Sequence, residues 1–150
     1  MTKPKLIGIN HVALEVGDID EALAFYGRFF AFELRGRGEG SAFIDLGDQF
    51  LALTTPRGQP RDEERHFGLV VDDREGLRER LEAAGVEIVT PRRLDFMDPW
   101  GNRIEIVPYE DIQFVKPRGA LEKLGAGDRR KTEEALKELR DKGIEPPDDA

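Results

Sequence analysis

The chain contains no cysteine, which excludes both disulfide bonds and thiolate metal ligands. Histidine is also rare, with two among 150 residues, and tryptophan occurs once. No apolar run is long enough to span a membrane, and the first residues lack the apolar core of a signal peptide. These absences predict a soluble protein, and we expect it to be cytoplasmic.

Acidic residues outnumber basic ones by 31 to 23, which gives a formal net charge of -8. Residues 116–150 hold equal numbers of both signs, so residues 1–115 carry the whole excess. An acidic body repels phosphate backbones and anionic lipid surfaces. The charge therefore argues against nucleic acid or a membrane as the main partner. With 39% hydrophobic residues, the chain is long enough for one domain with a real core.

The predicted elements occur twice in the same order, as one strand, one helix and three strands. Asp18 is placed to cap the first helix, and Asp72 or Asp73 the second, with Gly85 after its end. The expected strands cover residues 6–16, 32–35, 41–46 and 49–54, and then 66–71, 86–89, 93–97 and 103–107. Residues 55–65 are the expected linker. Each copy is too small to fold well alone, so we expect the two to pair around a shared surface.

Residues 115–150 follow a different pattern. Asp128 or Thr132 is placed to cap a helix that runs to about Lys142, with Gly143 beyond it. The apolar stripe of this helix is thin. We therefore expect a solvated helix docked on the body or on a partner subunit, and a lid over a binding site is the alternative.

The two histidines begin matching segments, H-V-A-L-E-V-G-D at His11 and H-F-G-L-V-V-D-D at His66. A third segment, F-M-D-P-W-G-N-R-I-E, ends at Glu105. Two imidazoles and one carboxylate are the protein part of a facial metal triad that leaves positions open for substrate. Strand alternation places Glu105 on a strand expected to be largely buried, where an unpaired carboxylate is costly. The alternative is that the histidines are satisfied by hydrogen bonds and Glu105 pairs with an arginine such as Arg103.

These segments resemble the vicinal oxygen chelate superfamily. Its members include glyoxalase I, fosfomycin-resistance thiol transferases, methylmalonyl-CoA epimerase, extradiol dioxygenases and bleomycin-resistance proteins. The resemblance covers residues 6 to about 110 and is carried by I-N-H-V-A-L-E-V, A-F-Y-G-R-F-F-A-F-E-L, R-H-F-G-L-V-V-D-D and D-P-W-G-N-R-I-E-I.

The resemblance implies an α+β fold of two βαβββ modules that form a half-open barrel. The modules would cover about residues 5–56 and 64–110, within a domain of residues 1–114 that is followed by a helical extension at 115–150. A divalent metal would be bound by His11, His66 and Glu105. The resemblance also implies a homodimer, with the cavity built within one chain or across two.

Some family features are missing. Glyoxalase I carries a Glu or Gln at a fourth ligand position, where this chain has Ala52. That difference argues against the glyoxalase I reaction and fits the three-ligand pattern of dioxygenases and thiol transferases. Extradiol dioxygenases use a further histidine and a tyrosine, which the segment before Glu105 lacks. Arg92, Arg93 and Arg103 are the candidates for binding the phosphonate of a thiol-transferase substrate.

We therefore expect a divalent-metal-dependent enzyme acting on a small substrate that chelates the metal through neighbouring oxygens. Fe, Mn, Ni, Co and Zn suit imidazole ligands better than Mg does. Glu105 is the first catalytic candidate, and Glu15, on the His11 face, is a candidate base at the pocket mouth. The alternative is a non-catalytic drug-binding protein of the bleomycin-resistance type. Phe43, Phe50, Phe67 and Phe96 are candidates to line an aromatic-binding pocket, and we expect most of them to pack in the core instead.

Overall fold

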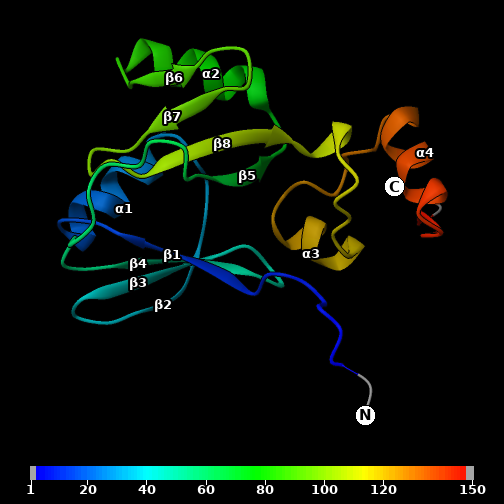
Figure 1. The fold of residues 1–150 in the computed structure, drawn as a ribbon, viewed down its shortest axis with the longest axis horizontal. Helices are drawn as coiled ribbons and strands as arrows, with labels where there is room; N and C mark the ends of the chain where they lie inside the picture. Colours follow the sequence, from blue (N-terminus) through cyan, green and yellow to red (C-terminus); the bar gives the residue numbers. More distant parts are fainter. Residues whose placement is uncertain (1–2, 148–150) are drawn as a thin grey trace. The chain divides into compact units, whose positions relative to one another are not determined.

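The computed structural model describes residues 3–147, and the chain divides into two compact units, Met1–Gly58 and Gln59–Ala150 (Figure 1). The elements of the first unit are β1 (His11–Glu15), α1 (Ile19–Gly27), β2 (Leu34–Arg37), β3 (Ser41–Asp45) and β4 (Phe50–Thr54). Those of the second are β5 (Phe67–Val71), α2 (Arg74–Ala83), β6 (Ile88–Thr90), β7 (Asp95–Met97), β8 (Arg103–Pro108), the 3-10 helix η1 (Tyr109–Asp111), α3 (Arg118–Lys123) and α4 (Glu133–Asp141).

The first unit holds one mixed sheet in the order β1-β4-β3-β2, with β1 parallel to β4. Helix α1 begins where predicted, because the Asp18 carboxylate accepts a hydrogen bond from the Glu21 backbone N–H at 2.9 Å. Helix α1 packs on this sheet through contacts with β4. The buried side chains of this core include Leu14, Val16, Ala22, Tyr26, Ile44, Leu51 and Leu53.

The second unit repeats this arrangement, with the order β5-β8-β7-β6 and β5 parallel to β8. Asp73 is the residue that caps α2, accepting from the Gly76 N–H at 2.9 Å, and Gly85 follows the helix with a φ of +66°. Figure 1 shows α2 along one face of this sheet. Its buried side chains include Leu77, Leu81, Phe96, Ile104 and Ile106.

The predicted fold class is confirmed. Each unit contains one β-α-β-β-β set, and neither four-stranded sheet closes on itself. The turn between β7 and β8 also forms as the D-P-W-G-N segment predicted. The Asp98 carboxylate accepts hydrogen bonds from the backbone N–H groups of Trp100 and Asn102 at 3.0 and 2.8 Å, and Gly101 supplies a φ of +88°.

The opening strand is shorter than predicted. It begins at His11 rather than Leu6, and Leu6, Ile7 and Ile9 are exposed. The reason is the length of its neighbour, since β4 begins at Phe50, which pairs with His11. The Asn10 carbonyl still accepts a hydrogen bond from the Phe50 N–H at 3.2 Å, but residues 3–9 belong to no strand, although the apolar pattern from Leu6 is that of a strand.

The strand predicted at 93–97 is also shorter, because β7 begins at Asp95. Leu94 precedes it with a φ of +60°, a left-handed conformation that interrupts an extended chain. Its N–H donates to the carbonyl of Thr90 at 2.8 Å and closes a turn. The strands predicted at 32–35 and 86–89 begin two residues later along the chain, at Leu34 and Ile88, and end at Arg37 and Thr90.

The C-terminal part docks on η1. Thr132 caps α4, and its N–H donates to the Glu110 carbonyl at 2.9 Å, while Ala135 and Leu139 are buried. Helix α3 was not predicted, because it is only six residues long and has no side-chain cap. Within the described residues, no helix combines the length and the apolar character needed to cross a bilayer.

Lys131 makes this docking pH-dependent. Its ammonium donates to the carbonyls of Tyr109 and Ile112 and lies 3.4 Å from the centroid of the Tyr109 ring. Burial lowers the pKa of Lys131 to about 8, while the Asp111 carboxylate acts in the opposite direction. The unfolded chain, with an ordinary lysine pKa, then holds more protons between about pH 8 and 10, so the free energy of unfolding increases with pH across this window.

We expect the melting temperature of Lys131→Met to be lower than that of the parent at every pH, because two carbonyls lose their donor. The increase that the parent shows between pH 8 and 10 should be smaller in this variant. Thermal unfolding followed by circular dichroism measures both effects. Lys137→Met, which removes an exposed lysine of α4, should keep the increase of the parent. An unchanged pH dependence in Lys131→Met would contradict the assignment.

Candidate metal centre

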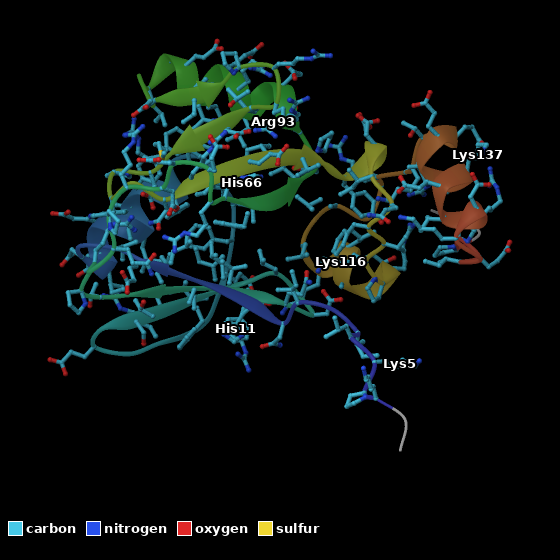
Figure 2. All side chains as sticks on the ribbon, in the orientation of Figure 1. Lys5, His11, His66, Arg93, Lys116 and Lys137 are labelled. Atoms are coloured by element: carbon cyan, nitrogen blue, oxygen red, sulfur yellow. The ribbon has the colours of Figure 1, made fainter. Side chains whose placement is uncertain are left out.

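Two of the three predicted metal ligands lie together in the second unit. The parallel register of β5 and β8 pairs Gly68 with Glu105, and His66 lies two residues before Gly68 on the same face. His66 Nε2 is 3.2 Å from Glu105 Oε2. The two side chains are 31% and 25% exposed, so the pair is partly buried. Figure 2 labels His66 beside this sheet.

The hydrogen bonding of His66 determines which ring nitrogen faces Glu105. Its Nδ1 is 2.8 Å from the Glu64 carbonyl oxygen. A carbonyl can only accept, so Nδ1 carries the hydrogen and the Nε2 of a neutral imidazole presents its lone pair. A lone pair and a carboxylate oxygen 3.2 Å apart can both be donated to one cation. The donor set therefore fits a divalent metal.

His11 has a similar arrangement in the first unit. It is the first residue of the edge strand β1, and its Nδ1 is 2.8 Å from the Asn10 side-chain oxygen. Its ring stacks on Phe50, with centroids 4.7 Å apart and planes at 11°. Donation from Nδ1 to the Asn10 oxygen leaves Nε2 as the lone-pair nitrogen here too.

The structure brings His66 and Glu105 together within one unit, whereas His11 belongs to the other unit. Among residues 3–147, no three His, Asp or Glu side chains are grouped closely enough to hold a metal ion. The pair in the second unit is thus the part of the predicted triad that has a defined geometry.

Glu15, the other predicted catalytic residue, contacts the start of the linker. Its Oε2 accepts a hydrogen bond from the Gly58 N–H at 3.0 Å, and its backbone carbonyl accepts one from Arg57 at 3.0 Å. Asp45 forms a turn, with its carboxylate accepting from the Gly47 N–H at 2.7 Å. Both carboxylates therefore have identified roles in local structure.

The non-helical face of the first sheet combines small and aromatic side chains. Ala52 is buried and pairs with Ala13 on one side and Phe43 on the other. Phe50 contacts Phe43 edge to face, with ring centroids 5.8 Å apart, and Arg35 lies 4.5 Å from the Phe50 centroid. This face provides an aromatic surface next to His11.

Arg103 does not pair with Glu105, contrary to the alternative considered for that carboxylate. It binds Asp95 instead, through Nε at 2.9 Å and Nη2 at 2.5 Å, and both residues are buried. Within the described part of the chain, the second oxygen of Asp95, Oδ1, has no hydrogen-bond partner. Sequence reasoning did not single out Asp95. A charged residue between Leu94 and Phe96, both fully buried, was the available signal.

Three comparisons relate the chain to known proteins. A family model described as the glyoxalase/bleomycin resistance protein/dioxygenase superfamily matches residues 8–106. An uncharacterised protein of Pseudomonas aeruginosa is 32% identical over 119 residues, which are 65% of this chain and 85% of that protein. The metallothiol transferase FosB of Lysinibacillus sphaericus is 27% identical over 111 residues, 65% of this chain and 79% of that protein. The crystal structure of a glyoxalase family protein from Bacillus anthracis matches with a TM-score of 0.55 and 27% identity, covering 71% of this chain and 98% of that one.

The linker just before His66 depends on a close approach at Gly101. A Cβ at Gly101 would lie 2.9 Å from the Arg61 Cα, whereas a Cβ at Gly85 would meet nothing within 4 Å. Both glycines have a positive φ. We expect Gly85→Ala to lower the free energy of unfolding by about 1 kcal/mol, and Gly101→Ala by about 3 kcal/mol or more, because only the second adds a backbone clash. Urea unfolding measures the difference, and equal losses in the two variants would contradict the close approach.

Proposed function

Since the chain belongs to the glyoxalase/bleomycin resistance protein/dioxygenase superfamily, we propose that it is a divalent-metal-dependent enzyme. Its substrate is a small molecule that chelates the metal through neighbouring oxygens, and the metal is bound by His11, His66 and Glu105. The observation that carries this proposal is the contact of 3.2 Å between His66 Nε2 and Glu105 Oε2, with Nδ1 already donating to the Glu64 carbonyl.

A metal bound there would act as a Lewis acid that stabilises negative charge on the substrate oxygens. The residues of the chain hold and orient it. Glu105 supplies an anionic oxygen from a strand whose neighbouring side chains, Ile104 and Ile106, are buried, and the Glu64 carbonyl keeps the His66 lone pair on Nε2. Glu15 is the proposed base, and its Oε2 is held by a hydrogen bond from the Gly58 N–H at 3.0 Å.

Among metal-dependent reactions, thiol transfer has the support of a relative's name. The Lysinibacillus sphaericus relative is a metallothiol transferase. Ala52, which has no ligating atom, fits a three-ligand metal that leaves positions for substrate. On this proposal, the metal-loaded protein consumes a thiol when it is given an electrophile with two neighbouring oxygens, and the metal-free protein does not.

Non-catalytic binding of a flat apolar drug is the second candidate. It is favoured by the surface formed by Phe43, Phe50 and Arg35 in the first unit, which could hold an aromatic ring. The two functions differ in their dependence on metal. A drug that binds equally well with and without metal, and undergoes no reaction, would support the binder.

We expect the parent to bind one Zn²⁺ or Mn²⁺ ion per chain, and Glu105→Ala, His66→Ala and His11→Ala each to weaken binding by about 100-fold or more. Loss of a ligand should cost at least as much as the 10- to 100-fold typical of residues that only support ligands. Elemental analysis and competition with a chromogenic chelator measure the stoichiometry and the affinity. Glu122→Ala, which removes an exposed carboxylate of α3, is the matched control and should bind as the parent does. Full binding by Glu105→Ala would refute the proposed centre.

A mixing experiment determines whether one chain or two build the centre. His11→Ala and Glu105→Ala chains are unfolded together and refolded. If His11 comes from a second copy, about one quarter of the sites regain all three ligands by statistical pairing. If all three ligands come from one chain, no site regains them, and the mixture binds metal as weakly as the separate variants.

We also propose that the protein is a homodimer whose contact includes the segment before β1. Leu6 and Ile7 are almost fully exposed there and Ile9 is 68% exposed, an apolar cluster of the kind that marks interfaces. The double variant Leu6→Asp, Ile7→Asp should weaken the dimer by about 100-fold or more, because each side chain contributes about 1.5–3 kcal/mol when buried. Sedimentation velocity measures the change. Val89→Asp, an exposed apolar position on β6, should stay dimeric, and a dimer of unchanged affinity in the double variant would exclude this segment.

A further inference from the structure

Arg103 links three separate segments of the second unit. Its Nε and Nη2 donate to Asp95 on β7, its Nη2 also donates to the Thr90 hydroxyl at the end of β6 at 3.2 Å, and its Nη1 donates to the Glu63 carbonyl in the linker at 2.5 Å. Each of the three guanidinium nitrogens therefore has an acceptor. Only arginine offers this planar set of donors, so lysine could not hold the three segments at once.

The linker is fixed at two further points near Arg103. The Asp62 carboxylate accepts from the Arg103 backbone N–H at 3.1 Å, and the Asp62 N–H donates to the Gly101 carbonyl at 2.8 Å. Arg65 donates to the other Asp62 oxygen, with its Nε at 2.9 Å. Backbone and side-chain contacts thus hold residues 62 and 63 against the start of β8.

The segment held by these contacts ends at Glu63, one residue before the Glu64 carbonyl that orients His66. Glu64 follows Glu63 directly, and its carbonyl accepts the hydrogen bond from His66 Nδ1. Because the peptide between residues 63 and 64 is planar, holding the Glu63 carbonyl restricts the path of the next residue. Arg103 also lies two residues before Glu105 on β8. The same residue is therefore connected to the segment that precedes His66 and to the strand that carries Glu105.

We propose that Arg103 is a positioning residue for His66. By holding Glu63 and Asp62, it keeps the Glu64 carbonyl against Nδ1 and so leaves the lone pair on Nε2, directed at Glu105. The expected effect of Arg103 on metal affinity rests on the proposed function. Its expected effect on which nitrogen of the His66 ring carries the hydrogen does not. The buried Asp95 balances the charge of Arg103, so Arg103 does not supply the cation for a substrate phosphonate, although the sequence suggested it.

The test reads the imidazole directly in the metal-free protein. Long-range ¹H–¹⁵N correlation spectra at about pH 9, where an ordinary imidazole is neutral, report which ring nitrogen carries the hydrogen. The chain has only two histidines, so the spectrum contains two rings and His11 serves as an internal reference. We expect His66 to carry its hydrogen on Nδ1 in the parent, and Arg103→Lys to shift it toward a mixture of both forms while His11 stays unchanged.

Zn²⁺ affinity is the second measurement on the same samples. Arg103→Lys should weaken Zn²⁺ binding by about 10- to 100-fold, as expected for a residue that orients a ligand without touching the metal. Arg93→Lys is the matched control, because Arg93 contacts the same Asp95 oxygen, at 3.4 Å, and its side chain is 50% exposed. This control should keep both the parent spectrum and the parent affinity.

Asp62→Ala tests the same linkage without breaking the buried Asp95–Arg103 pair, and it replaces Arg103→Lys if that variant does not fold. We expect the same change at His66, since the linker loses its contact with the Arg103 N–H. A parent with the hydrogen on Nε2 would overturn the proposal. So would variants that fold and keep the parent spectrum. A parent that shows the expected spectral change on mutation but binds no Zn²⁺ would instead refute the proposed function and leave the positioning role standing.

Discussion

The parallel pairing of β5 with β8 is the constraint on which the candidate centre depends. In that register Gly68 lies opposite Glu105, and the two-residue period of a strand brings His66 to the same face. A slip of one residue would turn Glu105 toward α2 and expose the side chains of Ile104 and Ile106, which are now buried. The hydrophobic core of the second unit therefore fixes the geometry of the His66–Glu105 pair.

The buried Asp95–Arg103 pair also supports the geometry of the His66–Glu105 pair. Burial of two charges is often no better for stability than apolar packing of the same size, so the pair calls for an explanation beyond stability. The contact of Arg103 with the Glu63 carbonyl provides one, because it ties the linker to the sheet just before His66. The first unit contributes a different kind of surface, in which His11 stacks on Phe50 at the edge of an apolar sheet face. The second unit thus offers charged and polar groups, and the first unit offers an aromatic surface.

Much of the fold could be predicted because its signals are local. Asp18 and Thr132 cap helices through bonds to residues three positions away, and Gly85 and Gly143 follow helices with positive φ values. The errors lie where a distant partner or an unusual backbone conformation decides. The segment from Leu6 has the alternation of a strand, but residues 3–9 belong to no strand, and the left-handed Leu94 delays β7. The membership of the superfamily, predicted from four motifs, is confirmed by the family match over residues 8–106.

The sequence by itself determined the order of the elements in the two repeated modules, the residues at which their helices begin, and the two histidines and one glutamate in the family motifs. Only the tertiary structure decided which carboxylate contacts Arg103 and which contacts His66. Arg103 binds Asp95, eight residues away, rather than Glu105, and its N–H binds Asp62, 41 residues away, while Glu105 faces His66. Propensities and caps act over about four residues, one helical turn, whereas the register of a sheet joins residues at any separation. The residue types therefore determine which chemistry the candidate centre can perform. The alignment of the strands determines which of these side chains contact each other.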